Sequence, residues 1–339
     1  MSLTQHEQKI LKSIHITSEN DPRRPEFPPD HPRFPATPVY RIKVPGFSNV
    51  WLKDESVNPT GTHKDRMAWE IVVTYHYFLL AKQQGQIKGK LPAMSLISSG
   101  NAALAIQTAL RKHQLPNLKV LVDKHTDKAI LAVLKKIGCE IHITDLSAQV
   151  LFTADILKLT DNVNGFDITS SIGLDPTTRF YDWLSYEIIN TSPEYCFIPF
   201  GTGNLYENIL NVGKKEITAI DHDPRFQGKV ATLRNCHFIG VTTNDKKSKA
   251  DKLYSPHLPF AGFNEQWISL YRQCGFCGNK SDVFVFREEY LNKAMDIAHD
   301  QGITCEPSGI SGLAMLLQLR HQVPVKAKIL IINTGKGKF

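Results

Sequence analysis

Short apolar runs alternate with amphipathic segments along most of the chain, and this alternation predicts its secondary structure. Runs of strand length occur over residues 40–44, 50–53, 93–97, 119–122, 140–144, 195–200, 236–242 and 328–332. Segments of helical length lie over residues 64–84, 102–111, 128–137, 148–159, 204–212, 288–301 and 310–321. Strands that alternate with helices in this way indicate parallel sheets joined by right-handed crossovers.

Three segments depart from this rhythm. Residues 64–84 are apolar on almost every side of the expected helix, which is typical of a buried helix. Residues 21–38 contain many prolines, which lack an amide donor and fix φ, so we expect an extended arm there. Residues 245–282 are rich in Lys, Ser, Gly and Pro and have no clean period, so we interpret them as a long loop of the kind that is often functional.

Length and composition agree with two α/β lobes. The chain has 339 residues, which exceeds the roughly 250–300 residues at which a single core stops growing. Apolar residues make up 42% and charged residues 22%. This balance excludes a disordered, collagen-like or coiled-coil protein. We therefore predict the α/β class, with two lobes that each contain a parallel sheet in a three-layer arrangement.

The formal net charge of +7 permits nucleic acid or an anionic ligand as a partner. The sequence has no nucleic-acid-binding motif and no patch in which aromatic and basic residues alternate, so we do not expect nucleic acid. No apolar stretch reaches the roughly 18 residues of a membrane span. The N-terminus also lacks the basic and apolar regions of a secretory signal, so we expect a cytoplasmic protein without a membrane partner.

The six cysteines are too few for a disulfide-stapled scaffold of this length. Cys274 and Cys277 form one Cys-x-x-Cys pair, and a zinc site would need a second pair of ligands with suitable spacing. None is visible, so we interpret them as two thiols in a loop and predict no metal site.

Ligands of open α/β sheets bind beyond the carboxyl ends of the strands, so the strand-to-helix junctions are the places to look for chemistry. In the first junction, Asn58–Arg66, a Pro-Thr-Gly turn leads to Lys64 at the start of the buried helix. Burial favours the neutral amine, which can form a Schiff base. A surface lysine that caps the helix is the alternative, although helix N-termini disfavour cations.

Three further junctions carry weaker signals. The small residues of Ser98–Ala102 let backbone amides approach an anion such as a carboxylate, although ordinary capping would explain them as well. The turn Phe200–Asn204 resembles a phosphate-cradling turn, but it lacks the third glycine of a dinucleotide site and the lysine of a Walker motif. Thr334 follows the last strand, where its hydroxyl can meet a polar ligand atom.

A lysine, an anion cradle, a phosphate cradle and a hydroxyl together suit a phosphorylated aldehyde that is bound covalently. The sequence resembles the fold-type II family of pyridoxal-phosphate enzymes, which includes threonine synthase, serine and threonine dehydratases, cysteine synthase and the tryptophan synthase β chain. The resemblance runs roughly from Thr37 to Gly337. It rests on Leu52–Ser56, on Asn58–Arg66 and on the later motifs, which occur in the order of the family.

The resemblance implies a role for each motif. Lys64 would form the Schiff base with pyridoxal 5′-phosphate and, once released, remove the α-proton of an amino-acid substrate. The cofactor would be bound by Lys64, His63, Asn101, Gly201, Thr202, Gly203, Asn204 and Thr334. The substrate carboxylate would be bound by Ser98, Ser99, Gly100, Asn101 and Ala102. Glu306–Gly309 is similar to a family segment that lies beside the cofactor.

The resemblance also implies an architecture. Residues 1–62 and 161–339 would form a large cofactor-binding domain, which includes a Pro-rich arm over residues 1–36. Residues 63–160 would form a smaller, mobile α/β domain, with the cofactor crevice between the two. A homodimer is expected on the same ground.

The implied activity is a β- or γ-elimination or replacement on an L-amino acid. The Lys-Asp-Glu-Ser and Thr-Gly-Lys-Gly segments are most similar to threonine synthase. The chain departs from that pattern with Ser99 in place of the usual threonine and with His63 in place of the usual phenylalanine. A basic cluster for a substrate phosphate is also not obvious, and Arg179, Lys336 and Lys338 are the candidates. A serine/threonine dehydratase, a cysteine synthase-like enzyme and a non-catalytic pyridoxal-phosphate-binding protein are the alternatives.

Overall fold

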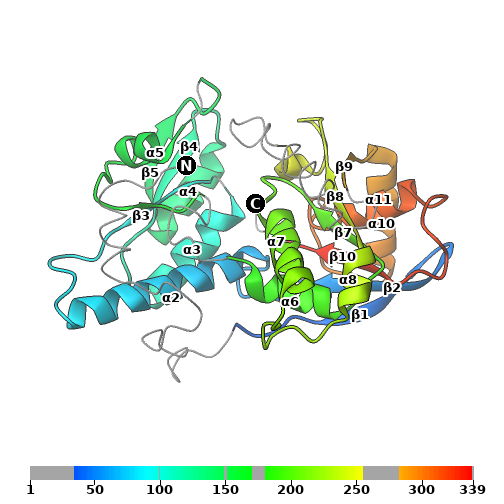
Figure 1. The fold of residues 1–339 in the computed structure, drawn as a ribbon. Coiled ribbons are helices and arrows are strands. Elements are labelled where there is room, and N and C mark those ends of the chain that lie inside the picture. Colours follow the sequence, from blue (N-terminus) through cyan, green and yellow to red (C-terminus); the bar gives the residue numbers. More distant parts are fainter. Residues whose placement is uncertain (1–33, 99, 149–150, 170–179, 255–281, 338–339) are drawn as a thin grey trace. The chain divides into compact units, whose positions relative to one another are not determined.

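Two sheets with their helices make up the computed structural model of the chain (Figure 1). The structure describes residues 34–98, 100–148, 151–169, 180–254 and 282–337. Contacts divide the chain into one unit that contains Lys64–Phe180 and another that contains Ala36–His63 and Tyr181–Lys338. The domain bounds expected from the sequence stay a prediction.

The smaller sheet has four parallel strands in the order β5-β4-β3-β6. Its strands are β3 (Met94–Ile97), β4 (Lys119–Asp123), β5 (Glu140–Thr144) and β6 (Phe166–Asp167). The helices of this unit are α2 (Lys64–Gln83), α3 (Asn101–Lys112), α4 (Lys128–Ile137) and α5 (Thr153–Leu159). Most of α2 is buried or half-buried, as the apolar pattern predicts.

Capping interactions explain why the predicted bounds are right for helix α4 and wrong for the start of helix α5. Helix α4 has the predicted bounds because Asp127 accepts the amide of Ala129 at 2.6 Å and Gly138 ends the helix with a φ of 106°. Helix α5 begins at Thr153, so the prediction of a start at residue 148 is wrong. The Asp155 carboxylate accepts the amide of Phe152 at 3.0 Å and fixes this later start.

The larger sheet has six strands in the order β1-β2-β10-β7-β8-β9. They are β1 (Val39–Val44), β2 (Phe47–Asp54), β7 (Tyr195–Pro199), β8 (His237–Thr242), β9 (Asp282–Val285) and β10 (Ile329–Asn333). Strands β1 and β2 pair antiparallel as a hairpin, whereas all other pairs are parallel.

Helices cover both faces of this sheet, with α6, α7 and α8 on one side and α10 and α11 on the other (Figure 1). Their bounds, with those of one 3₁₀ turn, are α6 (Asp182–Asn190), α7 (Asn204–Thr218), α8 (Val230–Asn235), η2 (Asp251–Leu253), α10 (Glu288–Asp300) and α11 (Ser311–Gln318). Every residue of β7 and β10 is buried. A strand between two helical layers has to be apolar on both sides, which explains these continuous apolar runs. The α/β class with parallel sheets is confirmed.

Several elements are missing from the sequence-based prediction, namely β6, α6, α8, η2 and β9. The long loop expected over residues 245–282 is wrong at its ends, because η2 forms at Asp251–Leu253 and β9 begins at Asp282. The central part of that loop, with Cys274 and Cys277, lies outside the described residues, as does nearly all of the Pro-rich arm.

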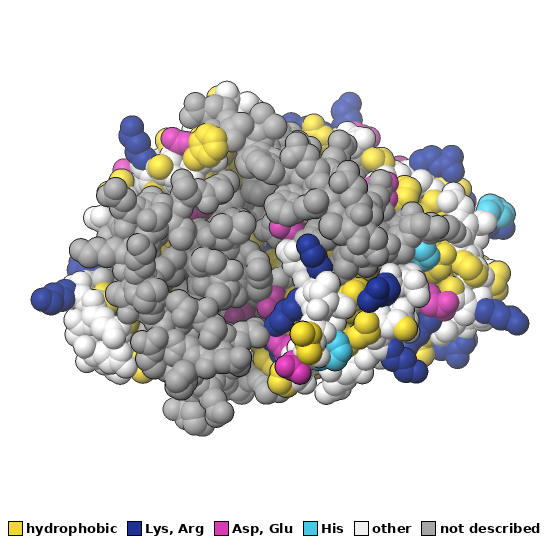
Figure 2. All heavy atoms as spheres, in the orientation of Figure 1, with side chains coloured by type: hydrophobic (Ala, Val, Ile, Leu, Met, Phe, Trp, Pro, Cys, Tyr) yellow, Lys and Arg dark blue, Asp and Glu magenta, His cyan; other side chains and the backbone are white. Residues whose placement is uncertain are grey.

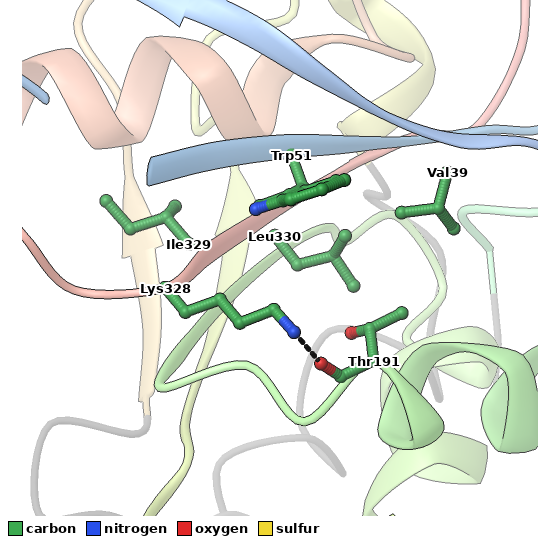
Figure 3. Close-up of a pocket in the computed structure, with 6 residues that line it drawn as sticks. All are labelled: Val39, Trp51, Thr191, Lys328, Ile329 and Leu330. Atoms are coloured by element: carbon green, nitrogen blue, oxygen red, sulfur yellow. Dashed lines mark hydrogen bonds between the residues drawn. The ribbon is translucent and has the colours of Figure 1, made fainter. Parts of the chain in front are cut away.

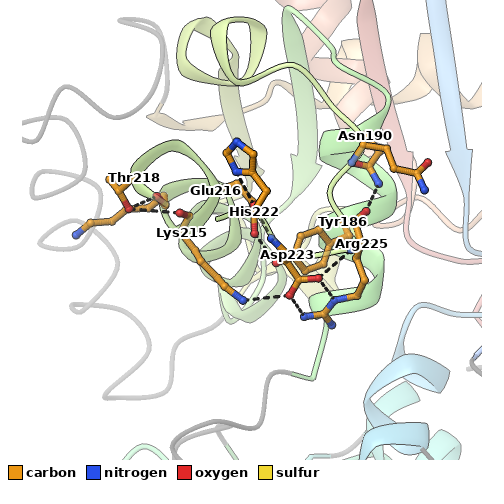
Figure 4. A network of polar contacts seen from close by, with 10 residues as sticks. Tyr186, Asn190, Lys215, Glu216, Thr218, His222, Asp223 and Arg225 are labelled. Carbon is orange, nitrogen blue, oxygen red and sulfur yellow. Dashed lines mark hydrogen bonds and ion pairs between the residues drawn. The ribbon is translucent and has the colours of Figure 1, made fainter. Parts of the chain in front are cut away.

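A polar network joins the loop between α7 and α8 to helix α6 (Figure 4). Asp223 accepts hydrogen bonds from Arg225 Nε at 2.8 Å and Nη2 at 2.7 Å, and Lys215 approaches it at 3.1 Å. The Arg225 guanidinium lies over the rings of Trp183 and Tyr186, 5.0 and 4.3 Å from their centroids. Burial alone would raise the pKa of Asp223, but the hydrogen bonds and charge of Arg225 outweigh it, so the pKa of this carboxyl lies well below its ordinary value.

We expect Asp223→Asn to lower the free energy of unfolding by about 2 kcal/mol at pH 7, because the half-buried guanidinium loses its carboxylate. A carboxyl whose pKa is lower in the folded state stabilises the protein above the unfolded-state pKa of about 4 and loses that effect as the pH falls through the folded value. The difference between variant and wild type should therefore shrink below about pH 4. Urea unfolding at pH 7 and pH 3 measures it, with Asp300→Asn as the exposed control. Equal stabilities at pH 7 would contradict this expectation.

The described part of the face shown in Figure 2 carries its positive charge in a dispersed form. Lys and Arg side chains are spread over the described part of the face shown in Figure 2, and Lys246, Lys247 and Lys249 are exposed. None of the described helices combines the length and apolar character that a membrane span requires.

A small apolar hollow lies at the amino end of β10, where Trp51, Val39 and Leu330 line it and Lys328 donates to the carbonyl of Thr191 (Figure 3). It lies at the opposite end of the strand from Thr334.

Candidate functional site

The carboxyl edge of the larger sheet gathers three of the predicted junctions. The register pairs Asn333 at the end of β10 with Asp54 at the end of β2, so the segments that follow these strands start side by side. Strand β7 pairs with the other side of β10 and leads into the turn Gly201–Asn204. Parallel strand ends therefore bring the chain before Lys64, the glycine turn and Thr334 to one edge.

The chain after β10 pairs with the chain before Lys64. Thr62 and Gly335 form an antiparallel bridge. The His63 amide donates to the carbonyl of Thr334 at 2.9 Å, and the Lys336 amide donates to the carbonyl of Gly61 at 2.9 Å. These contacts fix His63, the residue that precedes Lys64, beside Thr334.

Gly335 makes this close pairing possible. A Cβ built at Gly335 would lie 2.6 Å from the Gly61 carbonyl oxygen and 2.8 Å from the Thr62 Cα. The φ of Gly335 is 151°, a conformation that L side chains rarely adopt. On the other side, the Thr334 amide donates to the carbonyl of Gly309 at 3.1 Å. Thr334, which is 7% exposed, is thus fixed by its backbone from two directions.

His63 adds a side-chain contact to this pairing. Its Nδ1 lies 3.1 Å from the carbonyl oxygen of Thr334. A carbonyl only accepts hydrogen bonds, so Nδ1 carries the proton. The imidazole also packs on the ring of Tyr181, with the centroids 5.4 Å apart. The His63 ring therefore ties the residue before Lys64 to both the end of β10 and the start of α6.

The turn Gly201–Asn204 has the features of an anion-binding helix start. Gly203, with a φ of 83°, is the N-cap of the 15-residue helix α7, and none of the described side chains caps this end. The first amides of such a helix point outward and carry the positive end of its dipole. A Cβ built at Gly201 would lie 3.1 Å from the Lys252 carbonyl oxygen, so η2 packs directly on this turn.

In the other unit, Ser98–Ala102 lies between β3 and α3, at the carboxyl edge of the smaller sheet. Helix α3 begins at Asn101, one residue before the predicted start, with Gly100 as its N-cap. The Gly100 amide donates to Ser98 Oγ at 3.3 Å, whereas Ser99 lies outside the described residues. Lys64 begins α2 in the same unit and is half-buried.

Of the three basic residues expected to bind a substrate phosphate, the structure describes only Lys336. Arg179 and Lys338 lie outside the described residues. Lys336 is exposed, and its aliphatic stem lies against Gly61, where a built Cβ would be 2.7 Å from Lys336 Cε.

Four buried polar residues near the carboxyl edge of the larger sheet received no individual role from the sequence, namely Glu55, Asn58, Asn333 and Ser311, although the first two lie in the lysine motif. Asn333 ends an apolar strand, and its side chain donates to Asp54 Oδ1 at 2.9 Å and to the Thr304 carbonyl at 3.0 Å. An amide inside such an apolar run is the signal that the sequence offered for it.

The comparisons with known proteins agree with this geometry. Residues 33–335 match the family described as pyridoxal-phosphate dependent enzyme. The chain belongs to this family. A threonine synthase from Synechocystis sp. is 23% identical over 314 residues, which are 90% of this chain and 76% of the relative.

Solved enzyme structures share the fold of this chain. A hydrogen sulfide-producing enzyme from Fusobacterium nucleatum is similar with a TM-score of 0.59 and 17% identity, over 89% of this chain and 94% of that chain. Threonine deaminase isoform 2 from Solanum lycopersicum is similar with a TM-score of 0.56 and 16% identity, over 86% of this chain and 80% of that chain. The predictions of a pyridoxal-phosphate enzyme of fold type II and of its cofactor are thereby confirmed.

The residues at the carboxyl edge of the larger sheet fit the phosphorylated cofactor of this family. The amides of the uncapped glycine turn suit its phosphate. Ser311 is completely buried at the start of α11, and its Oγ has no hydrogen-bond partner within the part of the chain that the structure describes. A buried hydroxyl normally has a hydrogen-bond partner. A polar ligand bound at this edge would supply the partner that the described residues do not give to Ser311.

Proposed function

We propose that this pyridoxal-phosphate enzyme catalyses a β- or γ-elimination or replacement on an L-amino acid, with Lys64 as its Schiff-base lysine. One observation carries the proposal. Thr62 and His63, which directly precede Lys64, pair with Thr334 and Gly335 on the sheet edge that also holds the glycine turn before α7.

The motifs would divide the binding between them. The amides of Gly201, Thr202, Gly203 and Asn204 would bind the cofactor phosphate, with His63 beside it. Thr334 would contact the ring nitrogen, and Asn101 would contact the ring hydroxyl. The substrate carboxylate would bind at Ser98, Ser99, Gly100, Asn101 and Ala102, where the start of α3 provides amide donors.

The bound cofactor supplies an aldehyde that condenses with amino groups and a ring that delocalises negative charge from the substrate Cα. Lys64 Nζ takes the proton from that carbon as a general base and returns it in a later step. Thr334 offers a neutral hydroxyl to the ring nitrogen instead of a carboxylate. This tempers the withdrawal of electrons into the ring and favours loss of a leaving group over transamination.

Threonine synthase-like chemistry is the activity that we place first, since both the sequence motifs and the Synechocystis relative point to it. Lys336 supports it, because its stem crosses Gly61, three residues before Lys64. An ammonium in this place suits a substrate that carries a phosphate on its side chain.

A spectral and product screen with serine, threonine, O-acetylserine and O-phosphohomoserine tests this assignment. We expect O-phosphohomoserine to give turnover, and Lys336→Ala to raise its KM by about tenfold, the effect of one lost charge-assisted hydrogen bond. Lys326→Ala, an exposed lysine in the loop before β10, is the matched control. Turnover of serine or threonine alone would favour a dehydratase, and turnover of O-acetylserine alone a cysteine synthase-like enzyme.

The alternative from another class is a pyridoxal-phosphate-binding protein without turnover. A yellow protein whose spectrum shifts with no amino acid would support it. A homodimer and a cytoplasmic location stay predictions, and size-exclusion chromatography with light scattering tests the first.

A further inference from the structure

The segment between β2 and α2, residues 55–63, is named the lysine turn, because it ends next to Lys64. A connected set of polar side chains, all buried except the half-buried Glu187, lies next to it, and the proposed function assigns them no role. Its members, called the Asn58 network, are Thr37, Lys53, Glu55, Asn58 and Glu187.

Asn58 is the centre of the lysine turn. Its Nδ2 donates to Glu55 Oε2 at 2.7 Å and to the carbonyl of Thr62 at 3.0 Å. Its carbonyl accepts the amide of Gly61 at 2.8 Å, and its amide lies 3.3 Å from the carbonyl of Glu55. With 6% exposure, this asparagine has little access to water that could replace these bonds.

The Asn58 network extends from there into the sheet. Glu55 is completely buried, and its other carboxylate oxygen accepts a hydrogen bond from the hydroxyl of Thr37. The Lys53 side chain, only 1% exposed, pairs with the carboxylate of Glu187 and donates to the carbonyl of Thr37 at 2.8 Å. Buried charges persist only when they are paired and hydrogen-bonded, so each member depends on the others.

The Asn58 network also reaches β10. The Glu55 amide donates to the carbonyl of Asn333 at 2.9 Å, and Thr334 is the next residue. The lysine turn is therefore fixed at its start by the Asn58 network and at its end by the bridge between Thr62 and Gly335. Asn58 joins the two ends, because it contacts Glu55 on one side and Thr62 on the other.

We infer that Asn58 is the positioning residue of Lys64. Its side-chain amide holds the lysine turn in the one conformation that presents Lys64 for imine formation. Without the Asn58 side-chain amide, the Glu55 carboxylate and the Thr62 carbonyl each lose a buried hydrogen bond, which costs free energy. The lysine turn lowers this cost by changing its conformation. The inference rests on the proposed role of Lys64.

The test compares Asn58→Ala and Asn58→Asp with the control Asn162→Ala. Asn162 is a matched asparagine, since it is 8% exposed and its Nδ2 donates to the Ala93 carbonyl at 3.0 Å and to Ser95 Oγ at 2.9 Å, far from the lysine turn in sequence. Asn58→Asp keeps the shape but replaces the donor by an acceptor that faces Glu55.

Each apoprotein is titrated with pyridoxal phosphate, and imine formation is followed by absorbance and by borohydride trapping with peptide mapping. In parallel, each binds 4′-deoxypyridoxine 5′-phosphate, which has the phosphate and ring but no aldehyde. We expect both Asn58 variants to form the imine about tenfold to a hundredfold less well, the effect of losing one buried hydrogen-bond donor. Affinity for the analogue should stay within about twofold of wild type, because only imine formation depends on the position of the lysine.

The possible results distinguish a failure of the inference about Asn58 from a failure of the proposed role of Lys64. Equal losses for the pyridoxal phosphate imine and for the analogue would mean that Asn58 only supports the fold, and would overturn the inference. Wild-type imine formation in both variants would overturn it as well. Trapping of the wild-type cofactor on a lysine other than Lys64 would instead refute the proposed function. An Asn162→Ala protein that resembles wild type in both titrations shows that a lost buried asparagine does not suffice for the effect.

Discussion

Replacement of Lys64 by alanine is expected to abolish the covalent attachment of pyridoxal phosphate and to lower turnover by at least about 10³-fold. The variant loses the amine that forms the Schiff base and the base that removes the α-proton, and a positioned acid–base group alone contributes roughly 10²–10⁴-fold. The measurement is absorbance of the purified protein, followed by borohydride reduction and peptide mass spectrometry. Turnover assays use the substrate identified in the screen.

The control for this variant is Lys82→Ala, which removes an exposed lysine from the last turn of the same helix. It should keep the yellow colour, the reduced adduct and the wild-type rate. Retained activity in Lys64→Ala would show that another group is the base. A reduced adduct on a different peptide would show that another lysine forms the Schiff base.

The second large effect is expected for Gly335→Ala. The added methyl group would meet the Gly61 carbonyl oxygen and the Thr62 Cα, both backbone atoms that a side-chain rotation does not move. We expect a loss of about 3 kcal/mol in the free energy of unfolding, since overpacking and an unfavourable φ act together. The lysine turn has to shift to admit the methyl group, so imine formation should weaken too.

Gly46→Ala separates the two causes. Gly46 also has a positive φ, of 86°, but a Cβ there would meet no atom of the described residues within 4 Å. This control should lose only about 1 kcal/mol, from the backbone conformation, and should bind pyridoxal phosphate like wild type. Urea unfolding of the apoproteins and cofactor titration measure both quantities. Equal losses in unfolding free energy and equal cofactor binding for Gly335→Ala and Gly46→Ala would contradict this expectation. They would mean that the close pairing of the lysine turn with the end of β10 affects neither stability nor imine formation.

The fold was predictable where local signals and burial agree. Helix α4 has an aspartate at its N-cap and a glycine at its C-cap, and β5 has its predicted bounds. Strand β6 is only two residues long, too short for any period to show. Helix α6 has no side-chain cap at Tyr181, so only Asp182 in its first turn marks its start.

The candidate site was predictable to the extent that its motifs lie at strand ends. The amide turn before α7 and Thr334 after β10 follow from the apolar runs that precede them. The extension of the Asn58 network into α6 was not predictable, because it joins Lys53 with Glu187, residues far apart in sequence that only the folded chain brings together. Buried charges also look like surface charges in a composition count.

The place of β10 in its sheet has a consequence for the synthesis of the protein. This strand lies between β2 and β7, yet the ribosome makes residues 329–333 after every other described strand of the sheet. The parallel pairings of β10 with β2 and β7 therefore form only after both neighbours have been made, and they join segments that are far apart in the sequence. During translation, the lysine turn has no partner strand end until the ribosome has released β10, so the cofactor-binding edge is completed last.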